Sequence, residues 1–282
     1  MVTARFPNAL RTRLSSWGLF AASAAIFTLV YFFGILTHQG QRVENTVLES
    51  ATFEFGWRQI LRFVTVPNIA IALVALVALA AVGRRWRTAA QVAVIIGFSN
   101  ALTQLLKYAV LGRPDLIESQ SVNTFPSGHT VAFASVLMAA IIASPIWLRP
   151  FTALAATALM ATVSVQLLAF GWHRPSDIVG GLLLVTAITA LTQAVWPEHP
   201  RDTRASRWHR PALLVIVGAC VLALLWSGGI VLWLWLAEPV VPASQLLLLS
   251  EIGCALAAAI AIAVIFQHTR LTDGTNRSFA RR

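Results

Sequence analysis

The amino-acid sequence predicts an all-α protein, a polytopic bundle of transmembrane helices. Of its 282 residues 57% are hydrophobic and 11% are charged, whereas soluble domains carry about 25% charged residues. Long apolar runs hold most of the hydrophobic residues, and Trp17, Trp147, Trp172 and Trp196 lie near the ends of such runs. Tryptophan is enriched in this way at membrane interfaces, so we expect lipid to surround much of the chain.

Eight apolar runs are long enough to be spans, because a helix needs about 20 apolar residues to cross the hydrocarbon core. The first run follows three arginines, as in a signal peptide, but it is too long and no small-residue cleavage site follows it. We therefore expect a retained helix. The expected spans are 16–37, 63–83, 89–111, 128–148, 151–171, 177–196, 212–236 and 245–267.

The basic residues predict the orientation and the surroundings of these spans. With a cytoplasmic N-terminus, 15 Arg fall inside and 6 Lys or Arg fall outside, as the positive-inside rule requires. An even number of spans returns the C-terminus to the cytoplasm, so we expect an integral plasma membrane protein with both termini inside. The net charge of +10 is then explained by topology and anionic lipid head groups, and we expect no nucleic-acid partner.

Two gaps between spans suggest the organisation of the chain. The segment 197–211 is rich in Arg and Pro and is expected to be a cytoplasmic linker between six spans in 1–196 and two additional spans with a basic tail in 212–282. The longest outer loop, 38–62, holds three glutamates among apolar residues. A short amphipathic helix on the membrane surface would fit that loop.

Three segments carry residues suited to chemistry, and the predicted topology places all three on the outer side at similar depth. Lys107 and Arg113 lie at the outer end of the third span, a Phe-Pro-Ser-Gly-His segment opens the fourth, and His173–Asp177 links the fifth and sixth. A lysine and an arginine supply positive charge and directional donors for a phosphate. The three segments together therefore favour an anion site.

The other residues of these segments suit phosphate chemistry as well. Ser127 and Gly128 stand where a helix begins, where free backbone N–H groups and the helix dipole favour an anion, and glycine lets the backbone approach closely. His129 and His173 allow one nucleophile and one general acid. Asp177 follows His173 by four residues, so that on a helical turn it accepts a hydrogen bond from the ring and holds its tautomer.

These motifs resemble those of the type 2 phosphatidic acid phosphatase family, a membrane phosphatase superfamily with a six-helix core. The similarity covers about 89–196. The family's three motifs are Lys followed by Arg-Pro, then Pro-Ser-Gly-His, then Ser-Arg followed by His and, four residues on, Asp. In this chain they look like Lys107…Arg113-Pro114, Pro126-Ser127-Gly128-His129 and His173…Asp177.

The resemblance implies a role for each matching residue. His173 would attack phosphorus and form a phosphohistidine, His129 would protonate the leaving oxygen, and Asp177 would orient His173. It implies neither a metal nor a cofactor. The phosphate would be held by Lys107, Arg113, Ser127 and Gly128.

Two departures from the family pattern stand out. The first motif has five residues rather than six between its Lys and its Arg-Pro, and the third motif has Gln166-Leu167 where the family has Ser-Arg. Losing a charged donor to a buried phosphate costs roughly 2–5 kcal/mol if nothing replaces it. Arg174 is the nearest replacement in sequence, and Arg42 and Arg58 of the outer loop are alternatives.

The sequence thus favours a metal-independent hydrolase that acts on a lipid phosphate or pyrophosphate, polyprenyl or glycerolipid, at the outer membrane face. Its expected partners are that substrate and the membrane lipids. The alternative is a catalytically eroded protein that binds or translocates a lipid phosphate, which the missing arginine supports. A transporter with alternating access would show inverted repeats, and the sequence shows none. Without the other motif residues, Lys107 would be interpreted as a lysine whose side chain extends to the lipid head groups.

Overall fold

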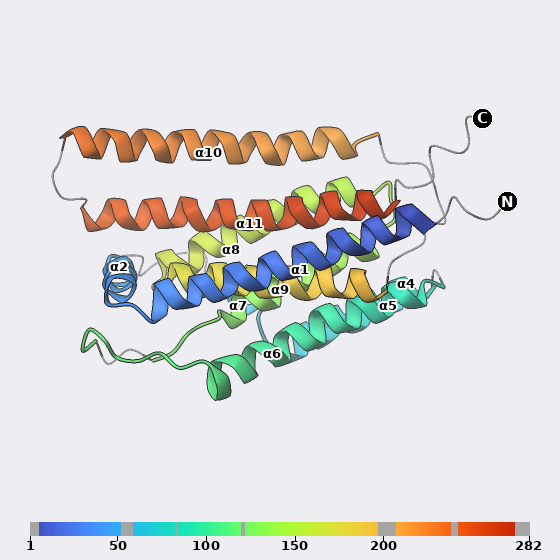
Figure 1. Cartoon of the computed structure of the whole chain (residues 1–282), viewed down its shortest axis with the longest axis horizontal. Helices are drawn as coiled ribbons and strands as arrows, with labels where there is room; N and C mark the ends of the chain where they lie inside the picture. The colour runs from blue at the N-terminus through green and yellow to red at the C-terminus, as the bar shows by residue number, and fades with distance from the viewer. Residues whose placement is uncertain are drawn as a thin grey trace.

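Helices make up almost all of the described part of the chain in its computed structural model, and most of them run along one common axis (Figure 1). The structure describes residues 6–51, 59–82, 84–119, 122–196, 207–237 and 242–273, among which no strand occurs. The elements are α1 Phe6–Ile35, α2 His38–Glu49, α3 Gln59–Arg62, α4 Val66–Val82, α5 Trp86–Ala93, η1 Val94–Phe98, α6 Ser99–Leu105, η2 Leu106–Val110, α7 Gly128–Ala143, α8 Arg149–Ala169, α9 Pro175–Val195, α10 His209–Ala237 and α11 Ala243–Asp273.

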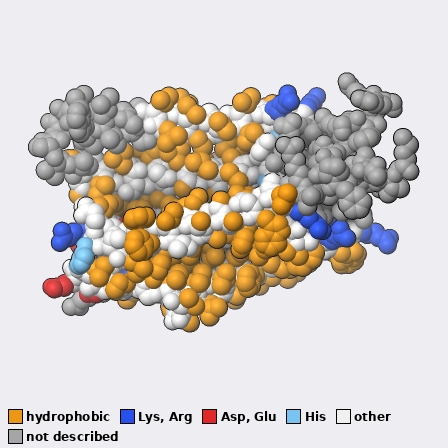
Figure 2. Space-filling model, viewed as in Figure 1, with side chains coloured by type: hydrophobic (Ala, Val, Ile, Leu, Met, Phe, Trp, Pro, Cys, Tyr) orange, Lys and Arg blue, Asp and Glu red, His pale blue; other side chains and the backbone are white. Residues whose placement is uncertain are grey.

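Each of the eight predicted spans overlaps a helical stretch, which confirms the predicted all-α fold class, although the helix predicted over 128–148 ends at Ala143. Hydrophobic side chains cover the long flank of the bundle and charged ones gather at its two ends (Figure 2). Three apolar helices are shorter, namely Val66–Val82, Gly128–Ala143 and the stretch His209–Leu225. Within the described residues, five stretches are long and apolar enough to cross a membrane: Arg13–Ile35, Trp86–Val110, Arg149–Ala169, Pro175–Val195 and Ala243–Thr269.

The helix α9 is the central element of the bundle. It is the most completely buried of the five long spans, and α1, α7 and α11 all pack against it. Its first residue, Pro175, suits the first turn of a helix because its missing N–H would find no partner there. The residues that begin α9 are therefore held from several sides.

The last two helices differ in how they join the bundle. The helix α11 packs along α8 and against α9, and it also contacts α2. The helix α10 packs against α11 and α8 and lies at the edge of the bundle (Figure 1). Part of 212–282 thus contributes directly to the support of α8 and α9.

A glycine in α9 lets the segment before α7 come close. The ring of Phe125 is fully buried and lies 5.0 Å from the ring of Phe27 and 5.4 Å from that of Tyr31, measured between centroids. A Cβ atom added to Gly180 would overlap the Phe125 ring. Only glycine therefore allows this aromatic cluster to seat the Phe125 segment against α9.

We expect Gly180→Ala to destabilise the protein, because overpacking a closed contact costs about 1–3 kcal/mol. Thermal unfolding of the detergent-solubilised protein would measure the loss. Gly253→Ala in α11 is the matched control, since an added Cβ atom there meets nothing within 4 Å. Equal melting temperatures for Gly180→Ala and the wild type would contradict a rigid seat for Phe125.

Candidate active site

Two histidines meet at the end of the bundle where α2 lies. His173 lies in the turn between α8 and α9, and His129 lies in the first turn of α7. Their ring centroids are 5.8 Å apart, and the His129 ring also packs edge-on against Trp172 at 5.3 Å. The second and third predicted motifs therefore come together, although 44 positions separate the two histidines in the sequence.

The backbone and one carboxylate hold His173 in place. Its backbone N–H donates to the carbonyl of Leu167 at 3.2 Å. Its Nδ1 atom lies 3.5 Å from Oδ2 of Asp177, a fully buried carboxylate one helical turn away. With Nδ1 facing the carboxylate, the Nε2 atom is the one left to react.

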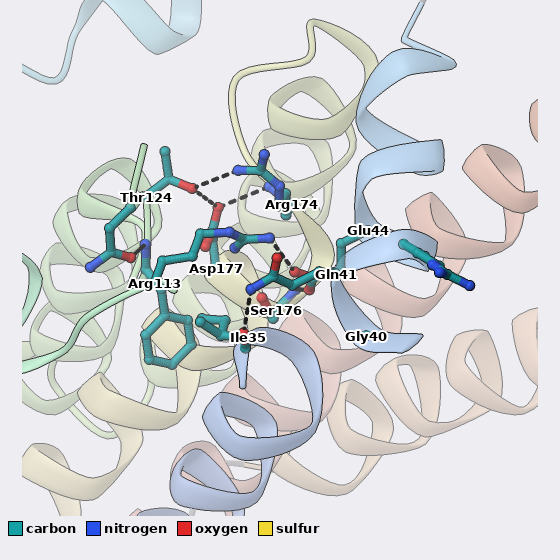
Figure 3. Close-up of polar contacts among 12 residues, drawn as sticks. Ile35, Gly40, Gln41, Glu44, Arg113, Thr124, Arg174, Ser176 and Asp177 are labelled. Carbon is teal, nitrogen blue, oxygen red and sulfur yellow. Dashed lines mark hydrogen bonds and ion pairs between the residues drawn. The ribbon is translucent and has the colours of Figure 1, made fainter. Parts of the chain in front are cut away.

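Thr124 holds the Asp177 carboxylate from the opposite side. Its hydroxyl donates to Asp177 Oδ2 at 2.6 Å, and the backbone N–H of Arg174 donates to the same oxygen at 2.9 Å. The Nη1 atom of Arg174 donates in turn to the Thr124 hydroxyl at 3.3 Å (Figure 3). Thr124 therefore joins the segment before α7 to the start of α9, a role that nothing in its sequence context predicts.

The predicted helix start at Ser127 and Gly128 is present. Ser127 is the N-cap of α7, and its hydroxyl accepts the N–H of Thr130 at 3.2 Å. Its own backbone N–H donates to the carbonyl of Asp177 at 2.9 Å. A Cβ atom on Gly128 would meet only Gln104, at 3.8 Å, so protein packing leaves this first turn open to close approach.

Lys107 lies in η2, a turn of π-helix at the end of a span. Turns of this kind occur frequently at functional sites. The half-buried side chain is within electrostatic reach of His129 and Asp177. The amide of Asn123 donates to the carbonyls of Lys107 at 3.1 Å and Leu111 at 2.7 Å, which satisfies carbonyls at the helix end. Asn123 thus ties the first motif to the segment that precedes the second.

Arg113 and Arg174 provide buried donors. The side chain of Arg113 is 2% exposed, and Arg174 is 3% exposed. The Nε and Nη1 atoms of Arg113 and the Nε atom of Arg174 have no hydrogen-bond partner among the described residues. Burial, and after it the charge of Arg113, lowers the pKa of Arg174. Because buried unpaired donors are costly, this pair is suited to bind an anion.

The helix α2 covers this cationic pair. It lies across the ends of the spans, and Thr37 caps it by accepting the N–H of Gly40 at 3.0 Å (Figure 1). The amide of Gln41 donates to the carbonyl of Pro114 at 2.6 Å, beside Arg113. Glu44 accepts the backbone N–H of Ser176 at 3.0 Å, and its Oε2 atom lies 3.5 Å from Nη2 of Arg113 (Figure 3).

The sequence predicted an amphipathic helix in this loop but not its polar contacts with the bundle. Gln41, Glu44 and Val47 are the buried residues of α2, so the side that faces the protein is largely polar. Polar side chains at helical spacing are usually exposed, and their partners lie far away in the sequence, so no local signal could identify Gln41 and Glu44.

The position of the missing motif arginine is part of the apolar core. Leu167 is fully buried in the main hydrophobic cluster. Of the three candidate replacements, Arg174 lies in the site, whereas Arg42 lies on the exposed face of α2. Arg58 lies outside the described residues. Arg174 is therefore the replacement that the geometry favours among the described ones.

This arrangement defines a class: a membrane-helix protein with a histidine pair, a carboxylate behind one ring and cationic donors suited to a phosphate. Residues 88–201 match the model of the PAP2 superfamily. This stretch, less than half of the chain, is therefore similar to that superfamily, whose members are phosphatases, and all three motifs fall within it. No curated protein and no solved structure gives a significant match. Within the described part of the chain, no three His, Cys, Asp or Glu side chains are grouped to hold a metal ion.

We expect the stability of the protein to fall with rising pH because of Glu44. Burial, followed by the charge of Asp177, raises the pKa of Glu44 from 4.5 to about 7. The folded state thus keeps a proton that the unfolded chain releases, so this stabilisation is complete below pH 4.5 and is lost as pH rises to about 7. The loss is on the order of 3 kcal/mol.

Thermal unfolding from pH 4.5 to 8 would measure this loss, with Glu44→Gln beside the wild type. The variant should lack the decline, and Glu49→Gln, an exposed residue of the same helix, should retain it. Parallel profiles for the wild type and Glu44→Gln would refute the assignment.

Proposed function

We propose that the chain hydrolyses a lipid phosphate or pyrophosphate through a phosphohistidine intermediate at the outer face of the plasma membrane. The observation that carries this proposal is the contact of His173 with Asp177 beside His129, with three cationic side chains nearby. The superfamily match supports a phosphatase acting on lipid phosphates. The excess of basic residues in the expected inner segments supports cytoplasmic termini and an outward-facing site.

Each group has a definite part in the proposed reaction. Nε2 of His173 attacks phosphorus while the bond from phosphorus to the lipid oxygen, or to the bridging oxygen of a pyrophosphate, breaks. His129 gives its proton to that leaving oxygen. Water then attacks the phosphohistidine, His129 takes the proton of the water, and inorganic phosphate leaves with His173 restored. Asp177 keeps the Nδ1–H tautomer of His173 throughout.

The phosphate oxygens would be bound by the donors around the two histidines. Lys107, Arg113 and Arg174 would offset the negative charge, and the first-turn N–H groups of α7 at Gly128 would bind the oxygens. The phosphate oxygens would accept hydrogen bonds from the unpaired Nε–H groups of Arg113 and Arg174. No metal ion is required in this scheme.

The second candidate function is binding or translocation of a lipid phosphate without hydrolysis. One observation favours it, namely the apolar, fully buried Leu167 in the place of the motif arginine. It predicts binding of phosphate-headed lipids without phosphate release.

We expect His173→Ala to abolish phosphate release by the purified protein from a panel of polyprenyl and glycerolipid phosphates and pyrophosphates, assayed without added metal. Removing the general acid in His129→Gln should lower the rate by about 10²–10⁴-fold. The exposed His38→Ala on α2 is the control and should keep the wild-type rate. Release by His173→Ala at the wild-type rate would exclude the mechanism, and a folded wild-type protein that binds these lipids without releasing phosphate would favour the second candidate.

We expect Arg174→Ala to weaken substrate binding by roughly 2–5 kcal/mol, the cost of losing a charged donor to a buried phosphate. The loss should appear in KM. Arg174→Lys should recover part of it, because lysine restores the charge but not the forked geometry. Arg42→Ala is the matched control on the exposed face of α2. A raised KM for Arg42→Ala with Arg174→Ala unchanged would assign the replacement role to the outer loop.

A further inference from the structure

Glu44 occupies donors that an anionic ligand would use. Its Oε1 atom accepts the N–H of Ser176 at the start of α9 at 3.0 Å, and its Oε2 atom lies 3.5 Å from Nη2 of Arg113. A helix N-terminus and a buried arginine are the two features that attract a phosphate. Glu44 lies outside the matched residues 88–201, so this contact comes from the chain's own N-terminal part.

The surroundings of Glu44 leave it little room to move away. The residue is 5% exposed, and a Cβ atom added to Gly34 of α1 would lie 3.3 Å from its Oε1 atom and 2.9 Å from Cβ of Ser176. The helices α1, α2 and α9 therefore enclose the carboxyl group closely. A change in its protonation is easier than a change in its position.

The ionisable groups around Glu44 differ in how many hydrogen-bond partners they already have. Arg113 faces it from the segment after η2, Arg174 and Asp177 from the start of α9, and the thiol of Cys254 from α11. Thr124, Arg174 and His173 already engage Asp177. Arg113 keeps its Nε and Nη1 atoms unpaired among the described residues, so it can bind an anion if Glu44 ceases to repel that anion.

We propose that Glu44 couples the capture of a phosphate group to the uptake of one proton from solvent. As a carboxylate, Glu44 offsets the charge of Arg113 and repels the anion; as a carboxylic acid, it keeps its bond from Ser176 through the carbonyl oxygen and leaves Arg113 to the anion. This inference rests on the proposed function, because it takes Arg113 and Arg174 as phosphate-binding residues. The pKa of about 7 that burial gives Glu44 puts the proton exchange near neutral pH.

The experiment measures sulfate binding to the full-length, detergent-solubilised protein by titration calorimetry between pH 6 and 8.5. Sulfate is a tetrahedral dianion over this whole range, so any proton taken up on binding goes to the protein. Repeating each titration in two buffers of different ionisation enthalpy gives the number of protons taken up. His129 and His173 are present in the wild type and in every variant, so the difference between proteins isolates Glu44.

We expect the wild type to take up close to one proton per sulfate at pH 8 and to bind about tenfold more weakly at pH 8 than at pH 6. Glu44→Gln, which keeps an oxygen to accept the Ser176 N–H, should take up no such proton and bind about as well at pH 8 as at pH 6. Glu49→Gln, exposed on the same helix and hydrogen-bonded to Asn45, should behave as the wild type.

Each of four other results would overturn the proposal. Equal proton uptake by the wild type and Glu44→Gln would assign the linkage to another group. Weaker binding by Glu44→Gln at every pH would make Glu44 a structural residue only. If Glu44→Gln does not fold, the absence of proton uptake by the wild type at pH 8 would overturn the proposal by itself. If no form of the protein binds sulfate, the phosphate site itself is excluded. An assay of phosphate release from lipids would then show whether the proposed function fails as well.

Discussion

The Asp177 carboxylate is the group on which the site depends. It is completely buried, and a buried charge is stable only when hydrogen bonds and opposite charges surround it. Here three partners come from two places in the chain: the Thr124 hydroxyl from the segment before α7, and the Arg174 backbone N–H and the His173 ring from the turn after α8. The contacts of one carboxylate oxygen, Oδ2, therefore join the segment before α7, the turn after α8 and the first turn of α9. Any rearrangement of these segments leaves that charge unpaired.

Gly34, Gly180 and the helix α2 make this arrangement possible by close packing. Gly180 leaves space for the Phe125 ring, and Gly34 leaves space for Ser176 and Glu44. The helix α2 then closes the end of the bundle with polar contacts from Gln41 and Glu44 beside the buried Val47. A site that binds a strongly charged anion needs both close packing and polar contacts. The arginines of the site must be desolvated enough to attract the anion, and they still need polar partners when no anion is bound.

The sequence was sufficient for the features that local chemistry determines. Long apolar runs predicted the long helical stretches of the described residues, and Ser127 with Gly128 predicted a helix start, because N-cap chemistry is local. The spacing of four between His173 and Asp177 placed the carboxylate one helical turn from the ring. The roles of Thr124, Asn123 and Glu44 could not be predicted, because their partners lie far along the chain; Glu44 and Ser176 are 132 positions apart. The π-helical turn around Lys107 likewise has no recognisable sequence signal.

The packing of α11 on α8 and α9 has a consequence for how the protein is made. Because α11 follows α8 and α9 in the chain, the faces of α8 and α9 that it covers lack this partner until α11 has been synthesised. The three motif segments are all synthesised before α11, but α9, which carries Asp177, gains the support of α11 only afterwards. Docking of α11 is therefore a separate step in assembly, and a chain interrupted before α11 would expose an apolar seam on α8 and α9.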